Sequence, residues 1–482
     1  MKSKFDFLLV AIVGLASMFA SVQMSYAQNS RVDVYPAPKE AELNADFGIR
    51  VRVDGGEWKN VDAYKVYVDK VVSGKHVTES SSMAYFDFEG EVEVEVTHNR
   101  GKIDSARVRP LSYGIPFDVN GNTLVFKLKE AANLSVEVNG DIFHNLQLFA
   151  NPIDVNKPKK IKGNKNLIYF APGFHDLGDE PLLVPSGKTL YVAGGAVIKG
   201  CVRVENAHDV KIQGRGMVYP HRQAGIYISN SKRVSVEGLM TTQCPTGGSD
   251  SVKIENVKVI SYYGWGDGLN VFASNNVWFD RVFARSSDDC STVYATRKGF
   301  SGGCKNIKMT NSVLWADVAH PIFIGLHGDI VNCDVIEDVV YENIDILDQA
   351  EFQVDYQGCM AICAGDNNLV RNVRFENIRV EEMRKGMLFN LRVCFNKKYC
   401  AAPGRGIENV LFKNVSYNGT NADYSIMTGY NQERQIKDIT FENLKINGEH
   451  IHDKMPGKPG WYKTSDMCRM FIGEHVENVV FK

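Results

Sequence analysis

A short motif recurs through the second two thirds of the chain at a spacing that drifts. It reads Asn-Val-Arg-Phe-Glu-Asn-Ile-Arg-Val at residues 372–380, and successive copies lie 24 to 37 residues apart. A fixed core with variable spacing predicts a parallel β-helix, because stacked strands keep their length while insertions collect in surface loops. Leucine-rich repeats, the main alternative, need a tighter leucine spacing that is absent here. The copies centre on Asn256, Asp280, Asn311, Asn343, Asn377, Asn414 and Asn443.

The central asparagine suggests how the coils turn. Asparagine tolerates a left-handed backbone, and the same position in neighbouring coils can form a ladder of side-chain hydrogen bonds. We expect the opening coil at residues 182–204, where Gly194-Gly195 and Gly200 mark turns.

The first third of the chain alternates apolar and polar residues with a period of two, which is typical of half-buried strands. Turn signals such as Asp54-Gly55-Gly56 separate these runs, and closely spaced short strands predict an antiparallel β-sandwich. Residues 151–165, rich in Lys, Pro and Asn, are expected to be the connection. We therefore predict an all-β fold, an N-terminal antiparallel β-sandwich at residues 28–165 followed by a right-handed parallel β-helix at residues 166–482. The sandwich strands are expected at residues 31–35, 49–53, 64–68, 92–96, 124–128 and 134–138.

Residues 1–27 have the pattern of a secretory signal peptide. Lys2 and Lys4 precede an apolar run at residues 7–20, and Ser25-Tyr26-Ala27 offers small residues before a cleavage point at Gln28. The apolar run is short for the ~20 residues that a membrane span needs. We expect an exported protein, periplasmic or secreted, with no membrane insertion.

The net charge and the positions of the cysteines limit which partners and which cross-links the protein can have. The 482 residues carry a formal net charge of −2, and a near-neutral chain argues against nucleic acid as a partner. All ten cysteines lie beyond residue 200. Cys394 with Cys400, and Cys290 with Cys304, are close enough in sequence to close disulfide loops in an exported protein. We expect most of the cysteines simply to pack in a β core, and no zinc site.

Three acids and a histidine fall at similar offsets after successive motif centres. Asp267, the pair Asp288-Asp289, and His320 lie 11, 8 and 9 residues after them, counting the pair from Asp288. These offsets predict one strand face of three consecutive coils, with Asp267 facing the pair across a strand spacing of about 4.8 Å. Crowded carboxylates raise one another's proton affinity, which suits a general acid. The alternative is that Asp288 and Asp289 are ordinary exposed turn residues.

The arrangement resembles a known superfamily. Asp267-Gly268, then Asp288-Asp289-Cys290, then His320-Pro-Ile-Phe-Ile-Gly are similar to the site residues of the polygalacturonase superfamily of β-helix glycosidases, over roughly residues 85–450. Within it the chain is most similar to glycoside hydrolase family 49, which holds dextranases and isopullulanases. The histidine is followed by proline rather than set in Gly-His-Gly, and a β-sandwich precedes the helix. The Arg-Ile-Lys signature with which polygalacturonases grip a uronate carboxylate is absent after His320.

The resemblance implies an exported, inverting glycoside hydrolase that cleaves α-glycosidic bonds of a polysaccharide, and we expect an α-glucan such as dextran or pullulan. It implies Asp288 as general acid, Asp267 and Asp289 as the pair that activates water, and His320 in support. It implies no metal and no cofactor, and we expect a monomer.

Other residues near the acids are candidates for sugar binding. Trp265 and Tyr294 flank the acids and are of the type that stacks on sugar rings, while Asn270, Arg297 and His327 are of the type that binds hydroxyls. Each of these side chains is equally compatible with a packing or loop role.

Three alternative functions stay open. A polygalacturonase-like pectin hydrolase would keep the acids and change the sugar. A polysaccharide lyase would want Lys or Arg as base, and Arg285 and Arg297 are near in sequence, but a cluster of three acids fits hydrolysis better. A non-catalytic carbohydrate-binding β-helix would need no acidic pair opposite Asp267.

Overall fold

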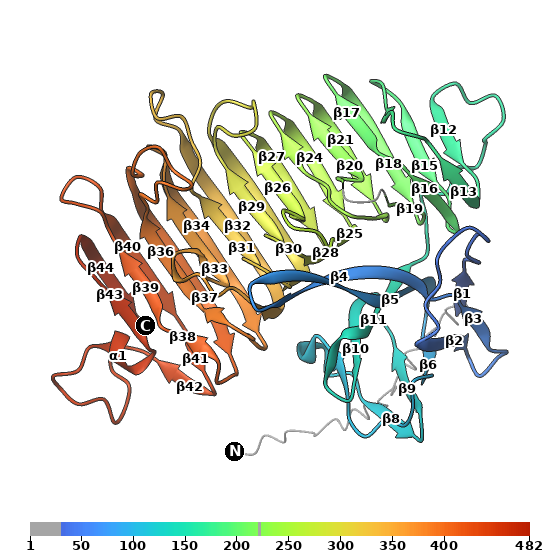
Figure 1. Cartoon of the computed structure of the whole chain (residues 1–482), viewed down its shortest axis with the longest axis horizontal. Helices are drawn as coiled ribbons and strands as arrows, with labels where there is room; N and C mark the ends of the chain where they lie inside the picture. Colours follow the sequence, from blue (N-terminus) through green and yellow to red (C-terminus); the bar gives the residue numbers. More distant parts are fainter. Residues whose placement is uncertain (1–29, 220–222) are drawn as a thin grey trace, which may run out of the picture.

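The chain forms a β-sandwich that lies along one side of a parallel β-helix (Figure 1). The computed structural model describes residues 30–219 and 223–482. The expected signal peptide at residues 1–27 lies outside the described residues. The last sandwich strand ends at Pro152 and the first strand of the β-helix begins at Leu167.

The sandwich consists of a five-stranded and a six-stranded sheet. The five-stranded sheet is antiparallel throughout, in the order β3-β2-β6-β9-β8. The six-stranded sheet runs β1-β5-β11-β10-β7, with β4 on β5, and differs from the expected antiparallel sheet in one place because β5 and β11 are parallel. The elements are β1 (Arg31–Val34), β2 (Phe47–Val53), β3 (Lys59–Val61), β4 (Tyr64–Val72), β5 (Lys75–Glu89), β6 (Val92–His98), β7 (Ala106–Arg109), η1 (Leu111–Tyr113), β8 (Phe117–Asn120), β9 (Thr123–Leu128), β10 (Ala132–Val138) and β11 (Asp141–Pro152).

All six predicted sandwich strands are present, but the short strands β3, β7 and β8 were not predicted, and neither were the long strands β5 and β11. Both lie in the middle of the six-stranded sheet and carry runs of consecutive buried residues. One face of this sheet packs on the other sandwich sheet and the opposite face packs on the β-helix. A strand buried on both faces loses the alternation by which half-buried strands are recognised.

The β-helix is built from two parallel sheets. Each full coil contributes two strand segments to a 20-stranded sheet and one to an 11-stranded sheet, counted over the described residues. The 20-stranded sheet comprises β12 (Leu167–Phe170), β13 (Gly173–Asp176), β15 (Thr189–Val192), β16 (Ala196–Lys199), β18 (His208–Gly214), β19 (Met217–Val218), β21 (Lys232–Glu237), β22 (Met240–Thr241), β24 (Asp250–Glu255), β25 (Lys258–Ile260), β27 (Asn275–Asp280), β28 (Phe283–Ser286), β30 (Cys304–Ala316), β32 (Val335–Gln349), β34 (Leu369–Val380), β37 (Gly406–Tyr417), β40 (Ile436–Glu442), β41 (Leu444–Ile446), β42 (Glu449–Ile451) and β44 (Val476–Phe481).

The 11-stranded sheet takes one strand from each coil in chain order, and short elements complete the molecule. Its strands are β14 (Leu182–Leu183), β17 (Val202–Glu205), β20 (Ile226–Ser229), β23 (Thr246–Gly247), β26 (Leu269–Phe272), β29 (Ser291–Tyr294), β31 (Ile322–Gly325), β33 (Met360–Ala364), β36 (Phe389–Val393), β39 (Ser425–Thr428) and β43 (Met470–Ile472). Outside it lie the pair β35 (Gly386–Met387) and β38 (Ala422–Asp423), with η2 (Val354–Tyr356) and α1 (Thr464–Met467). The right-handed parallel β-helix is thus confirmed.

The predicted opening coil at residues 182–204 was one coil too late, although the predicted start of the β-helix at residue 166 lies next to its first strand. β12 and β13 already pair in parallel with β15 and β16, so the first coil begins at Leu167 rather than at residue 182. This coil lacks the asparagine motif, which left no repeat signal in the sequence.

The motif centres adopt the expected left-handed backbone, with one correction. Asn256, Asn311 and the later centres have φ between 53° and 59°. In the copy at residues 275–282, however, Asp280 pairs with Thr310 and Arg281 takes the left-handed position at φ 51°. The assignment of Asp280 to the motif centre was therefore one residue early.

Asparagine ladders run between the coils at two positions of the motif. At the centres, Asn343 Nδ2 donates to Asn311 Oδ1 at 2.8 Å, and Asn443 Nδ2 donates to Asn414 Oδ1 at 2.8 Å. The first residue of the motif forms a second, unpredicted ladder, in which Asn409 Nδ2 donates to Asn372 Oδ1 at 2.9 Å. Both residues of that second pair also have a left-handed backbone. Each motif copy thus turns twice, and each turn is hydrogen-bonded to the copy beside it.

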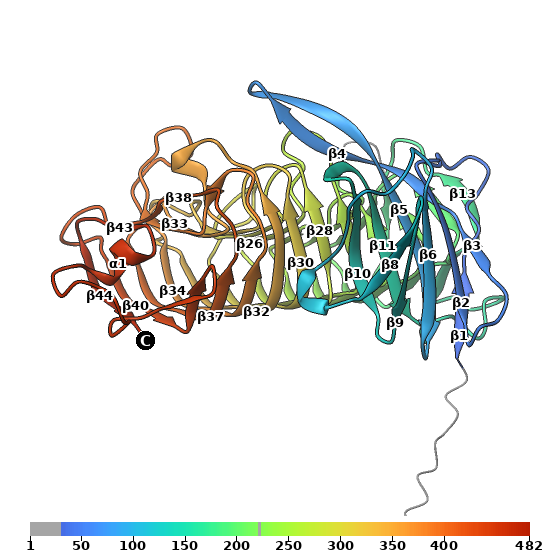
Figure 2. The ribbon, with the colours of Figure 1, turned by 90° about the horizontal axis from the view of Figure 1, so that it is seen from below.

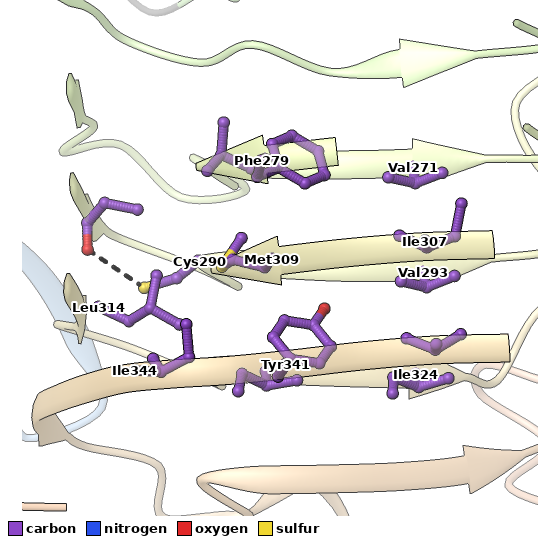
Figure 3. Packing of buried hydrophobic residues seen from close by; sticks show 14 of the residues in the cluster. Val271, Phe279, Cys290, Val293, Ile307, Met309, Leu314, Ile324, Tyr341 and Ile344 are labelled. Carbon is purple, nitrogen blue, oxygen red and sulfur yellow. Dashed lines mark hydrogen bonds between the residues drawn. The ribbon is translucent and has the colours of Figure 1, made fainter. Parts of the chain in front are cut away.

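Apolar side chains fill the interior of the coils in layers (Figure 3). Toward the C-terminus, Phe375, Phe412 and Phe441 stack with ring centroids 4.9 Å apart. The ten cysteines, all within the described part of the chain, are free thiols, and seven of them are buried. The possible disulfides Cys290–Cys304 and Cys394–Cys400 are therefore not formed, while the expectation that most cysteines pack in the core is confirmed.

The sandwich is joined to the β-helix through a mixed apolar and ionic interface. Tyr85 and Phe149 of the six-stranded sheet pack with Phe283 and Trp315 of the β-helix. The fully buried Arg285 crosses this interface: its Nε and Nη2 donate to the carboxylate of Asp317 at 2.8 and 3.0 Å. Arg285 also bonds the sandwich. Its Nη1 donates to Asn145 Oδ1 at 2.9 Å, and its Nη2 donates in addition to the Ile142 carbonyl at 3.0 Å. Arg109 and Arg215 make similar buried ion pairs elsewhere along the interface.

We expect Arg285→Leu to lower the free energy of unfolding by about 3–5 kcal/mol, because it leaves the buried Asp317 carboxylate without its main partner. The double variant Arg285→Leu/Asp317→Leu should recover a large part of that loss. Urea midpoints of the three proteins test this expectation. Arg31→Leu, which breaks the exposed Arg31–Asp33 pair, serves as the control, and an equally small effect at Arg285 would contradict the role given to the buried pair.

Candidate active site

Strand register brings the predicted acids and the histidine to one place. β26, β29 and β31 are neighbours in the 11-stranded sheet, with Leu269 opposite Ser291 and Ser291 opposite Ile322. Asp267, Asp289 and His320 each lie two residues before these paired positions, so they occupy the same place in three successive coils. The alignment predicted from the motif spacing is confirmed. Asp288 stands beside this row, and its Oδ1 accepts from the Asp289 backbone N–H at 3.0 Å.

Two glycines allow the chain around Asp267 to approach the next coil. The Gly268 N–H donates to the Asp289 carbonyl at 2.8 Å, and a Cβ on Gly268 would lie 2.5 Å from the Cys290 carbonyl oxygen. A Cβ on Gly266 would lie 2.2 Å from Ser287 Oγ. Side chains at either position would push Asp267 away from Asp289, which accounts for the sequence Gly-Asp-Gly.

Three donors converge on Asp289. Its Oδ1 accepts from the His320 backbone N–H at 3.2 Å and lies 2.7 Å from His320 Nδ1, while its Oδ2 accepts from the Tyr294 hydroxyl at 3.0 Å. The carboxylate is buried, so these bonds hold it in a single orientation. Asp289 is therefore the most firmly oriented of the three acids.

His320 is enclosed by aromatic rings and is 0% exposed. Phe323 stacks on its imidazole at 4.2 Å between centroids and 8° between planes, and Tyr356 packs edge-on at 4.5 Å. With its Nδ1 on Asp289, the ring acts on the site through that carboxylate. In the described part of the chain its buried Nε2 has no hydrogen-bond partner.

Burial and mutual repulsion change the proton affinity of the other two acids. Burial and the charge of Asp289 raise the pKa of Asp267 to about 7, although the nearby Lys298 ammonium and a 2.5 Å hydrogen bond from Asn270 Nδ2 oppose the rise. Burial and the charges of Asp267 and Asp289 raise the pKa of Asp288 well above its ordinary value. A cluster of this kind retains a proton near neutral pH, which a general acid requires.

Two residues that sequence analysis missed also border the acids. Burial raises the pKa of Glu351, whose carboxyl lies close enough to interact with Asp288 and His320. Tyr356, in η2, packs against His320 and is itself stacked by Tyr399 at 5.2 Å. Both precede β33, the next strand of the 11-stranded sheet, but Tyr356 and Glu351 lie four and nine residues before Met360 rather than two, so the repeat gave no signal for them.

Comparison with known proteins fits this geometry. The family model described as glycosyl hydrolases family 28 matches residues 191–459, more than half of the chain. The chain belongs to glycosyl hydrolases family 28. Dex49A from Penicillium minioluteum has the same fold at 12% identity, with a TM-score of 0.60 and 93% of this chain and 96% of that chain covered. A family 28 exopolygalacturonase from Yersinia enterocolitica is also 12% identical, with 81% and 96% covered and a TM-score of 0.47. No curated protein sequence matches the chain.

The predicted sugar-binding residues of this family 28 protein differ in their surroundings. Trp265 is exposed two residues before Asp267, whereas Asn270 is buried against Asp267. Tyr294 is only 5% exposed and its hydroxyl bonds Asp289. Its ring is therefore not accessible for the expected stacking on a sugar. His327 is buried edge-on against Tyr294, with Nδ1 3.6 Å from an Asp366 carboxylate oxygen, and burial lowers its pKa. It is thus poorly placed to bind a hydroxyl, while Arg297 is exposed and available.

Arg297 and Lys298 form the tip of a loop that is anchored over the sheet. Arg297 and Phe300 exchange two backbone hydrogen bonds of 3.0 Å, which close a tight turn. The Phe300 ring stacks on Phe272 at 6.3 Å and covers Gly247, where an added Cβ would lie 2.2 Å from the ring. The turn therefore presents two cations near Asp267 and His327.

The strand after the histidine carries no cation. β33, which follows β31 in the 11-stranded sheet, has Ala361 opposite Phe323 and Cys363 opposite Gly325. Both side chains are buried in an apolar cluster. β33 therefore does not present a uronate-binding Arg-Ile-Lys segment at this place.

Two further properties concern the described residues as a whole. No group of three or more His, Cys, Asp or Glu side chains among residues 30–219 and 223–482 is placed to hold a metal ion. No helix in this part of the protein has the length and apolar character needed to cross a membrane.

We expect Asp267→Asn to stabilise the folded chain above neutral pH. Because the pKa of Asp267 is raised from 3.8 to about 7, the folded chain binds its proton more tightly than the unfolded chain. The free energy of unfolding should therefore fall as pH rises from about 4 to about 7. The variant removes this fall, so its melting midpoint should exceed that of the parent by roughly 2–5 °C at pH 8 and match it near pH 4. Asp118→Asn, which neutralises an exposed carboxyl on β8, should show no such pH dependence.

Proposed function

We propose that this protein is an exported, inverting glycoside hydrolase that cleaves α-glycosidic bonds of a neutral polysaccharide, an α-glucan such as dextran or pullulan. The observation that carries the proposal is the row of Asp267, Asp289 and His320 on successive coils with Asp288 beside it. Membership of family 28 supports hydrolysis of a glycosidic bond. The motif likeness to family 49 and the absence of a cation on β33 support a neutral sugar.

Each acid receives a role from its surroundings. Asp288, whose pKa is raised well above its ordinary value by burial and two neighbouring charges, gives its proton to the leaving glycosidic oxygen. Asp289, held by Tyr294 and His320, orients and deprotonates the attacking water together with Asp267. A single displacement by water inverts the anomeric carbon.

A second candidate function is favoured by the Arg297–Lys298 turn. Two exposed cations beside the acids suit a substrate that carries carboxylate or sulfate groups, such as polygalacturonate. The same acids would then act on a uronide, with this turn in place of the missing Arg-Ile-Lys segment. Replacement of both cations by Gln distinguishes the two, because it raises KM strongly only for an anionic polymer.

The deciding experiment measures reducing ends released from dextran, pullulan, starch, polygalacturonate and β-glucans by the parent and by Asp288→Asn. We expect release from one α-glucan, a fall of about 10²–10⁴-fold in the variant, and products whose anomeric configuration is inverted by proton NMR. Unsaturated products that absorb in the ultraviolet would indicate a lyase instead. Release from polygalacturonate alone would favour the second candidate.

Tyr294→Phe should lower kcat about tenfold with little change in KM, because only the hydroxyl that orients Asp289 is lost. Tyr341→Phe is the matched control, since it removes a buried tyrosine hydroxyl that bonds Ser291 Oγ inside the coil. Both variants should lose about 1 kcal/mol of stability. A kcat that falls equally in the two would show that the effect at Tyr294 is general loosening of the coil.

A further inference from the structure

An exposed tryptophan stands beside the catalytic row in a strained backbone conformation. Trp265 lies two residues before Asp267, is 78% exposed and has φ +68°. A left-handed backbone is unfavourable for a bulky side chain and persists only where the surroundings enforce it. A large indole left open to water next to a reactive site is typical of a binding surface.

The loop that carries Trp265 is held rigidly from the catalytic side. Ser287 Oγ, next to Asp288, donates to the Tyr263 carbonyl at 2.5 Å, and Ser261 Oγ donates to the Gly266 carbonyl. These bonds fix both ends of a short turn. The position of the indole is therefore coupled to that of the acid-bearing segment.

A second support comes from the preceding coil. Gln243 Nε2 donates to the Tyr263 hydroxyl at 2.9 Å and to the Trp265 carbonyl at 3.4 Å. Since Gln243 belongs to the coil on the N-terminal side of Asp267, the loop is bonded to that coil, which lies away from His320, as well as to the coil of Asp288.

The sandwich supplies a third support through the β4–β5 hairpin. The Tyr67 ring of β4 packs against Tyr262 at 5.0 Å, and Tyr262 packs edge-on against Tyr263 at 5.8 Å. The Tyr67 hydroxyl donates to Glu42 Oε2 at 3.0 Å, which fixes its ring. β4 crosses the β-helix in front of β28 and contacts β25 and β28 (Figure 1). Tyr67, Tyr262, Tyr263 and Trp265 together form what we call the aromatic rim.

The hairpin extends further than the sandwich requires. Its pairing continues to Val72 and Lys75, and Val72 and Val77 near the tip are 46% and 39% exposed. Figure 2 shows the tip projecting past the coils. A two-stranded ribbon is only marginally stable without packing partners, so the extension adds nothing to the sandwich core.

We propose that the aromatic rim is a glycan-binding subsite on the side of Asp267 away from His320, where Trp265 stacks on a sugar ring of the polysaccharide. The β4–β5 hairpin is a positioning element of this subsite, and Tyr67 acts through Tyr262. The sandwich thereby takes part in substrate binding. This inference rests on the proposed function for the identity of the ligand as a polysaccharide.

Binding is measured by affinity electrophoresis of the inactive Asp288→Asn protein in native gels that contain dextran, pullulan, starch or polygalacturonate. We expect one polymer to retard the protein, and Trp265→Ala to weaken that retardation about fivefold to tenfold. Tyr67→Ala should weaken it less, and Tyr67→Phe should restore it because the ring is kept. Trp278→Ala, which removes a partly exposed tryptophan on β27 of the other sheet, serves as the matched control.

Kinetics in the active protein separate binding from catalysis. Trp265→Ala and Tyr67→Ala should raise KM for the polymer with kcat nearly unchanged, which a general loss of folding would not do. Retardation that Trp265→Ala abolishes, in a protein that hydrolyses nothing, would uphold the rim and overturn the proposed function. Retardation that survives in both alanine variants, or no retardation by any polymer, would overturn the rim.

Discussion

The backbone register between coils is the constraint on which the site depends. Hydrogen bonds from the Gly268 N–H to the Asp289 carbonyl and from the Cys290 N–H to the His320 carbonyl, both 2.8 Å, tie three consecutive coils together. They hold Asp267 and His320, which are 53 residues apart in sequence, only two strand spacings from each other. Repulsion between the carboxylates works against this arrangement, and the stacked core beneath it supplies the opposing stability.

The sandwich also helps to hold the segments that carry the acids and His320 in place. Asp317, three residues before His320, is neutralised by Arg285, which is in turn bonded to Asn145 and Ile142 of the sandwich. The segment leading to His320 is thus anchored in the other part of the molecule. Removing the sandwich would leave buried charges behind the cluster of acids without partners, which explains why the two parts pack over so continuous an interface.

The periodic features of this molecule were readable from sequence, and the non-periodic ones were not. The asparagine motif gave the β-helix and aligned Asp267, Asp289 and His320, because turns and strands repeat with it. The first coil, β5 and β11 escaped because they lack either the motif or an alternating pattern. Glu351 and Tyr356 escaped because they lie in the irregular segment between β32 and β33, where no position of the motif marks them. Tyr294 was predicted to stack on a sugar, whereas its buried hydroxyl bonds Asp289, a contact that no repeat in the sequence indicates.

The turn that presents Arg297 and Lys298 is attached through Phe300, whose ring rests on Gly247 and Gly248. Phe300 therefore holds the turn in place, while Arg297 and Lys298 carry its exposed charges. Substitutions at the tip can invert or erase its charge while the ring keeps the loop in place and the acids keep their geometry. Such a division lets substitutions at the tip of the loop change which polymer is bound, while the chain stays folded and the acids keep their places.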